Sequence, residues 1–103
     1  MGNNTGGNPL RYDTTTGASW TKTKSVRLIQ WVDLNEDIAD SDELVMTMNG
    51  GVVVQCEIQV DADNLCLGGG AVAWQIGPFN PGIAISDFSI DTLDGGVVYI
   101  WIN

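Results

Sequence analysis

Apolar and polar residues alternate at a spacing of two in several short segments of this chain, and no stretch repeats apolar residues at helical spacing. Such alternation places successive side chains on opposite faces of an extended strand. The alternating segments are residues 25–33, 43–48, 52–60, 71–76 and 83–90, and residues 97–102 form a further strand-like apolar segment. About six or seven short strands with Gly-rich turns predict an all-β fold, either a small antiparallel β-sandwich or a small barrel. We favour the sandwich, of jelly-roll-like form.

Turn residues separate these segments. Asn49-Gly50 tolerates positive φ and therefore predicts a tight hairpin between two of the strands. Residues 77–82 contain two prolines and predict a loop. Within the next segment the apolar phase slips near Ser86-Asp87, which indicates a β-bulge.

Charge is distributed unevenly along the chain. All 4 basic residues and only one of the 13 acids lie in residues 1–27, so this part carries a formal +3 and residues 28–103 carry −12, which together give the net −9. A net charge of this sign disfavours nucleic acid, whose phosphates are bound mainly by lysine and arginine, and it disfavours anionic membranes. We therefore expect neither as a partner.

The first 24 residues are rich in glycine, asparagine and threonine and contain few apolar side chains. A segment of this composition does not bury enough apolar surface to offset its ordering entropy alone. We therefore divide the chain into an extended N-terminal arm, residues 1–24, and a β-sandwich domain, residues 25–103. The arm is expected to lie against a neighbouring molecule, and the alternative is that it folds back on its own acidic face.

The last strand, residues 97–102, is apolar on both faces. Val98, Ile100 and Ile102 can fill the core, which leaves Val97, Tyr99 and Trp101 for a second surface. Either another part of the same chain covers that surface, or it is a subunit interface, where tyrosine and tryptophan are enriched. The candidate partner-binding residues of arm and last strand are Leu10, Arg11, Tyr12, Trp20, Lys22, Lys24, Arg27, Tyr99 and Trp101.

The sequence contains few of the residues that catalysis or metal binding requires. The chain has no histidine, which excludes a Ser-His-Asp or Cys-His arrangement, so we expect no enzyme, no catalytic residue and no cofactor. Cys56 and Cys66 fall on opposite faces of a predicted hairpin and should be free thiols, at least one of them buried.

The acidic stretch 33–43 has the oxygen spacing of a calcium loop at its start. Ile38 and Leu44 stand where that loop needs glycine and glutamate, which excludes an EF-hand. We therefore predict no metal-binding residue, although a looser calcium site at Asp37, Asp40 and Asp42 stays open.

Three segments resemble a known class of proteins. Ser25 to Trp31, Glu43 to Gly50 and Thr92 to Ile100 together are similar to the small β-sandwich proteins that decorate or cement the capsids of tailed bacteriophages. The resemblance implies a virion structural protein without a cofactor, present as a homotrimer or in many copies, with a major capsid protein as partner. It also implies a virion location after synthesis in the host cytoplasm, which fits a chain without a signal peptide or membrane span.

Two other functions remain open. One is a carbohydrate- or calcium-binding module of a phage tail or surface protein, with Trp74, Phe79 or Trp101 as a stacking platform. The other is an assembly subunit of a tail or pilus-like polymer.

Overall fold

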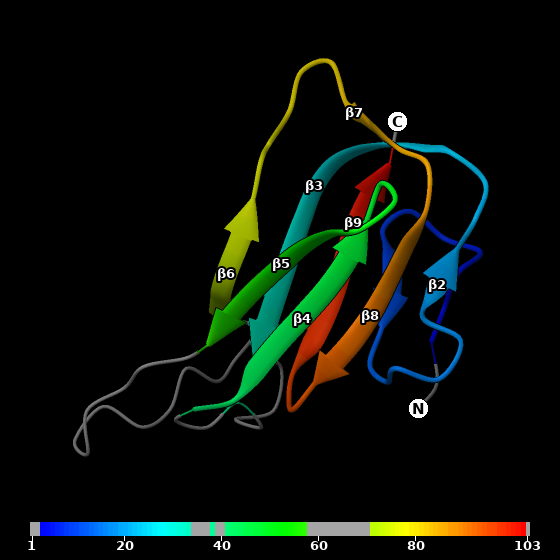
Figure 1. The fold of residues 1–103 in the computed structure, drawn as a ribbon. Helices are drawn as coiled ribbons and strands as arrows, with labels where there is room; N and C mark the ends of the chain where they lie inside the picture. Colours follow the sequence, from blue (N-terminus) through cyan, green and yellow to red (C-terminus); the bar gives the residue numbers. More distant parts are fainter. Residues whose placement is uncertain (1–2, 34–37, 39–40, 58–70, 103) are drawn as a thin grey trace.

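The computed structural model describes residues 3–33, 38, 41–57 and 71–102 and confirms the all-β sandwich (Figure 1). Two antiparallel sheets pack together. The first sheet has the strand order β1-β9-β3-β6, with β7 also paired to β3, and the second has the order β2-β8-β4-β5. The strands are β1 Leu10–Tyr12, β2 Ser19–Trp20, β3 Lys24–Asp33, β4 Glu43–Met48, β5 Val52–Glu57, β6 Ala71–Ile76, β7 Ile83–Ile85, β8 Phe88–Leu93 and β9 Val97–Ile102.

The two halves of the chain pair in reverse order. The first strand β1 pairs with the last strand β9, β2 pairs with β8, β3 pairs with β6 and β7, and β4 pairs with β5, all antiparallel. This nested pairing defines a jelly roll, in which the chain crosses repeatedly between the two sheets. The structure therefore confirms the jelly-roll-like prediction.

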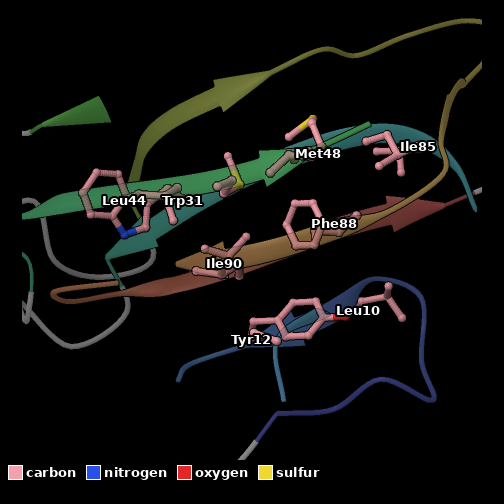
Figure 2. Close-up of a cluster of buried hydrophobic side chains, with 14 of the residues drawn as sticks. Leu10, Tyr12, Trp31, Leu44, Met48, Ile85, Phe88 and Ile90 are labelled. Carbon is pink, nitrogen blue, oxygen red and sulfur yellow. The ribbon is translucent and has the colours of Figure 1, made fainter. Parts of the chain in front are cut away.

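The core lies between the inner faces of the two sheets (Figure 2). Trp31 is fully buried, and its indole Nε1–H donates a hydrogen bond of 2.8 Å to the carbonyl oxygen of Gly95. Trp20 and Phe88 stack with their ring centroids 4.4 Å apart. The inward residues of β4 and β9 are in this core, which contains Leu44, Met46, Met48, Val98 and Ile100, with Ile102 partly buried against it.

The N-terminal segment differs from the prediction. The core includes Leu10 and Tyr12 of β1 and Ala18 and Trp20 at β2. Residues 10–12 pair with β9 at the edge of the first sheet, and residues 19–20 pair with β8 at the edge of the second. The predicted boundary between arm and sandwich at residue 24 is therefore wrong. The difference arises because an edge strand that pairs with a neighbouring strand needs only two inward apolar side chains to be held in the sandwich.

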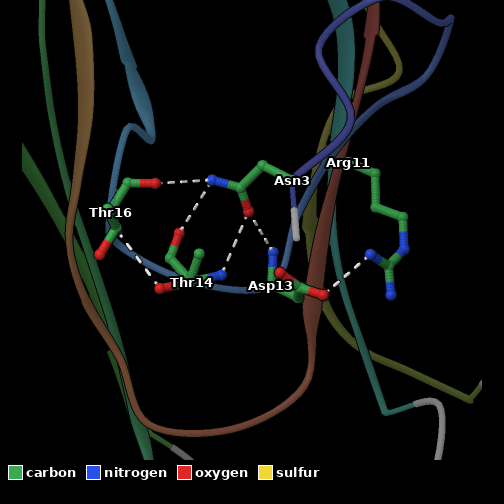
Figure 3. Close-up of polar contacts among 5 residues, drawn as sticks. All are labelled: Asn3, Arg11, Asp13, Thr14 and Thr16. Carbon is green, nitrogen blue, oxygen red and sulfur yellow. Dashed lines mark hydrogen bonds and ion pairs between the residues drawn. The ribbon is translucent and has the colours of Figure 1, made fainter. Parts of the chain in front are cut away.

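Asn3 fixes the path of this segment (Figure 3). Its side-chain oxygen accepts hydrogen bonds from the backbone N–H groups of Asp13 at 2.8 Å and Thr14 at 3.2 Å. Its side-chain nitrogen donates to the carbonyl oxygens of Thr14 at 3.4 Å and Thr16 at 3.0 Å. One amide therefore satisfies four backbone groups of the connection between β1 and β2, which orders a turn that is poor in apolar contacts.

The phase slip at Ser86-Asp87 has a different cause from the predicted bulge. The chain leaves the first sheet after β7 and enters the second sheet at β8, so apolar residues change face because the strand changes sheet. Asn49 stabilises the connection between β7 and β8, since its side-chain oxygen accepts a 2.8 Å hydrogen bond from the backbone N–H of Ser86. The predicted hairpin at Asn49-Gly50 is confirmed, with positive φ at both residues.

A β-bulge does occur in β3, where sequence alternation predicts none. The register of β3 against β9 shifts between Val26 and Leu28, so Arg27 is the extra residue. As a result Val26 lies in the core with Ile29 and Trp31, instead of on the outer face with Leu28. The bulge leaves the Arg27 side chain exposed on the outside of the sheet.

Candidate functional site

The nine predicted partner-binding residues do not form one surface. Leu10, Tyr12 and Trp20 are core residues, so the prediction that they bind a partner is wrong: they already contact their own sandwich. The others are at least partly exposed and fall into two places. Lys22 lies in the connection from β2 to β3 and Lys24 is the first residue of β3, whereas Arg11, Arg27, Tyr99 and Trp101 lie further along the strands of the first sheet.

The lysine pair has only one contact of note in the described structure. The Lys24 ammonium nitrogen lies 5.6 Å from the centroid of the Trp20 ring, within the range of a cation–π interaction. Lys22 is exposed. This connection therefore keeps a positive charge at the surface.

The outer face of the first sheet carries a row of polar side chains across four strands. Arg11 of β1 pairs with Tyr99 of β9, Tyr99 pairs with Gln30 of β3, and Gln30 pairs with Gln75 of β6. Arg11 also forms an ion pair of 2.9 Å with Asp13. Because paired residues of neighbouring strands point to the same side, this row presents a guanidinium, a phenol and two amides on one face.

A hollow lies beside this row. Its lining is Arg27, Leu28, Pro78 and Trp101, and its volume is about 200 Å³. Trp101 pairs with Leu28 across the two central strands, and 39% of its surface is exposed. Of the three proposed stacking residues, Trp101 alone faces out here, because Trp74 packs against the core and Phe79 is half-buried.

A second surface feature is a set of exposed valines on the outermost strands β5 and β6. Val52 and Val53 of β5 are 56% and 60% exposed, and Val72 of β6 is 45% exposed. Both strands end their sheet orders, and Figure 1 shows them at the same side of the sandwich. We call these three residues the valine flank, although they do not form one patch: Val53 pairs with Thr47 on the outer face of the second sheet, and Val72 pairs with Val32 on the outer face of the first.

The apolar residues of β5 and β6 that face the core are less completely buried than those of the other strands. Five of the seven half-buried apolar residues that pack against the core belong to these two strands, namely Val54, Cys56, Ala73, Trp74 and Ile76. Sequence reasoning missed the flank, although Val52-Val53-Val54 is apolar on both faces, the same signal that singled out the last strand.

Neither metal binding nor membrane insertion gains support from the described residues. Asp37 and Asp40 of the possible calcium site lie outside them, and within them no three His, Cys, Asp or Glu side chains gather closely enough to hold an ion. No helix in this part of the chain is long and apolar enough to cross a membrane.

The prediction of a buried thiol applies in part, since Cys56 is free and half-buried, and Cys66 lies outside the described residues. The Cys56 thiol donates a weak 3.7 Å hydrogen bond to the carbonyl oxygen of Leu44. Burial raises the pKa of the Cys56 thiol from 9.0 to about 11, because the thiolate loses hydration. Cys56 is therefore an inert structural side chain at neutral pH.

We expect iodoacetamide to modify Cys56 slowly at pH 8 in a Cys66→Ser variant, and faster as the pH approaches 11. Well below pH 9 the thiol is almost entirely neutral in both folded and unfolded chains, so its contribution to stability is intact there. Between about pH 9 and 11 the unfolded chain ionises first, and stability falls as the pH rises. Mass spectrometry of time points at several pH values measures the rate, with the urea-unfolded chain as control. Equal rates for folded and unfolded chains at pH 8 would contradict this expectation.

Comparison with protein-family models, with curated proteins and with solved structures found no match.

Proposed function

We propose that this protein is a non-enzymatic virion structural protein, a capsid decoration or cement subunit that associates with other copies of itself and with a major capsid protein. The observation that supports association is the valine flank. Val52, Val53 and Val72 are exposed aliphatic side chains on strands that end their sheets. Long apolar edge strands invite pairing with another chain and are normally covered or charged.

The flank replaces the N-terminal segment as the surface for association. Residues 10–12 and 19–20 are committed to the sandwich, so they cannot reach across a neighbouring subunit while the domain is folded. The outer edge of β5 pairs with none of the described strands, and a strand of a second copy would pair there along Val52 to Val54. The jelly roll is used by viral capsid domains and also by lectins, so this analogy is compatible with the proposal but does not decide it.

The test is the oligomeric state of the full chain, measured by size-exclusion chromatography with light scattering over a range of concentrations. We expect the wild-type chain to associate and a Val53→Lys/Val72→Lys variant to remain monomeric, because a contact at either β5 or β6 would then have to bury an ammonium group. Thr5→Lys is the matched control, since Thr5 is exposed and lies on another part of the molecule.

A wild-type chain that stays monomeric at every concentration would contradict the proposal, and so would a variant that associates as strongly as wild type. Far-UV circular dichroism of both variants checks that the sandwich is intact. Co-sedimentation of wild type with capsid shells, lost in the valine variant but kept in the control, would extend the result to the shell partner.

A further inference from the structure

We propose that the hollow at Trp101 binds one acidic pyranose residue of a glycan, a sugar ring that carries a carboxylate. This site is separate from the valine flank and from assembly. Leu28 and Arg27 lie near the start of β3, whereas Val72 pairs with Val32 near the end of that strand. A surface or virion protein can therefore use both at once.

Three elements build the hollow. The bulge in β3 contributes Arg27 and Leu28, β9 contributes Trp101, and the loop after β6 contributes Pro78. The loop sits directly on the bulge, since the Phe79 backbone N–H donates a 2.7 Å hydrogen bond to the Arg27 carbonyl oxygen. The approach requires glycine before Pro78, because Gly77 has a φ of +105° and a Cβ there would lie 2.7 Å from the same oxygen.

A chain of hydrogen bonds, which we call the amide relay, connects the two walls. The Trp101 indole N–H donates to the side-chain oxygen of Gln30 at 3.3 Å. The Gln30 amide donates to the side-chain oxygen of Gln75 at 3.3 Å, and the Gln75 amide donates to the carbonyl oxygen of Gly77 at 3.4 Å. The relay holds the indole in one orientation, so a ligand that stacks on it meets a preorganised surface.

The walls match the two sides of an acidic sugar. The indole of Trp101, with Leu28 and Pro78, offers an apolar surface to the C–H groups on one face of a pyranose ring. Arg27 at the rim offers a planar fork of donors that fits a carboxylate in a bidentate manner. The Arg27 side chain is exposed, and among the described residues no acid forms an ion pair with it.

The neighbouring polar row supplies donors for hydroxyl groups. Each relay amide uses one N–H in the relay and keeps a second. Tyr99 lies in the same row, one pleat from Trp101. The volume of about 200 Å³ is below the range of pockets that enclose a drug-sized molecule, which fits one sugar ring with the rest of the glycan outside.

Net charge does not prevent an anion from binding here. The chain carries −9, but exposed charges separated by more than about 8 Å are largely screened at physiological ionic strength. Arg27 is the nearby charge that decides the interaction. Affinity should therefore decrease as salt is raised, because the Arg27–carboxylate contact is exposed.

The test uses a galacturonate trisaccharide, the matched neutral galactose trisaccharide and a short Asp-rich peptide. Binding is followed by nuclear magnetic resonance of the four indole N–H signals, with the Trp101 signal assigned from a Trp101→Phe variant. We expect the acidic trisaccharide to shift the Trp101 signal in a saturable way and the Trp31 signal little. The neutral sugar should bind about tenfold or more weakly, because it lacks the charge-assisted contact.

Variants assign the roles. Arg27→Gln should reduce affinity for the acidic sugar to that for the neutral one, and Trp101→Ala should abolish binding of both. Lys22→Gln is the matched control, since it removes the same charge from an exposed site outside the hollow. Gln30→Ala should weaken binding and broaden the Trp101 indole signal alone. General destabilisation of the fold would instead broaden the signals of all four tryptophans.

Three outcomes would overturn the proposal. The first is no saturable shift of Trp101 with the acidic trisaccharide while the unliganded spectrum shows a folded chain. The second is binding that Arg27→Gln and Trp101→Ala leave unchanged. The third is preferential binding of the Asp-rich peptide, which would identify a site for protein carboxylates instead.

Discussion

A chain truncated to residues 25–103 should fail to form a stable sandwich. The truncation removes β1 and β2, and with them the buried side chains of Leu10, Tyr12 and Trp20. Burial of a large apolar side chain stabilises a fold by about 1.5–3 kcal/mol, and the whole free energy of unfolding of a small domain is about 5–15 kcal/mol. The truncation also leaves β8 and β9 without their outer partners. Loss of cooperative unfolding in urea and of dispersed amide signals would be the observed result.

The matched control keeps the length and removes charge. A full chain with Lys22→Gln and Lys24→Gln should unfold at nearly the same urea concentration as wild type, because neither side chain is buried in the core. If the truncated chain unfolded cooperatively with a free energy within about 1 kcal/mol of the full chain, the N-terminal strands would be dispensable. The segment would then be an arm, as its composition predicts.

The body of the fold could be predicted from the sequence, because its central strands each contain three or more inward side chains. Leu44, Met46 and Met48 alternate over six residues, and period-two patterns of that length are hard to mistake. The first two strands have three and two residues, so each shows one alternation at most. Their pairing partners lie far along the chain, and only the closed jelly roll shows that these pairs are needed.

Phase slips were ambiguous for a physical reason. A bulge and a change of sheet both move apolar residues to the other face, so the slip at Ser86-Asp87 predicts a bulge where the chain changes sheet, and the pattern does not predict the bulge at Arg27. Because the bulge at Arg27 is not predicted, the hollow beside it is not predicted either. Alternation placed Trp101 on a second surface, but the hollow depends on the contact of Gly77 with the bulge, which is tertiary and leaves no local pattern.

The largest loss of stability from a single substitution is expected for Trp31→Ala. Trp31 is fully buried at the centre of the first sheet, on a strand that pairs with both β9 and β6. Removing a buried tryptophan side chain costs about 3–5 kcal/mol, because the transfer energy is lost and a cavity remains. Urea unfolding followed by circular dichroism measures the change, with the slope of the transition as a check that the chain still unfolds in one step.

Two further variants separate the causes of that loss. Trp31→Phe keeps most of the packing but removes the indole N–H that donates to the Gly95 carbonyl oxygen, so its loss should be intermediate. Trp101→Ala removes the same side chain from a position that is 39% exposed, and it should cost clearly less than Trp31→Ala. Equal losses at positions 31 and 101 would mean that Trp101 is covered in solution, which would point to a contact over the outer face and against a free hollow. The comparison of the two tryptophans therefore tests both the core and the accessibility of the proposed glycan site.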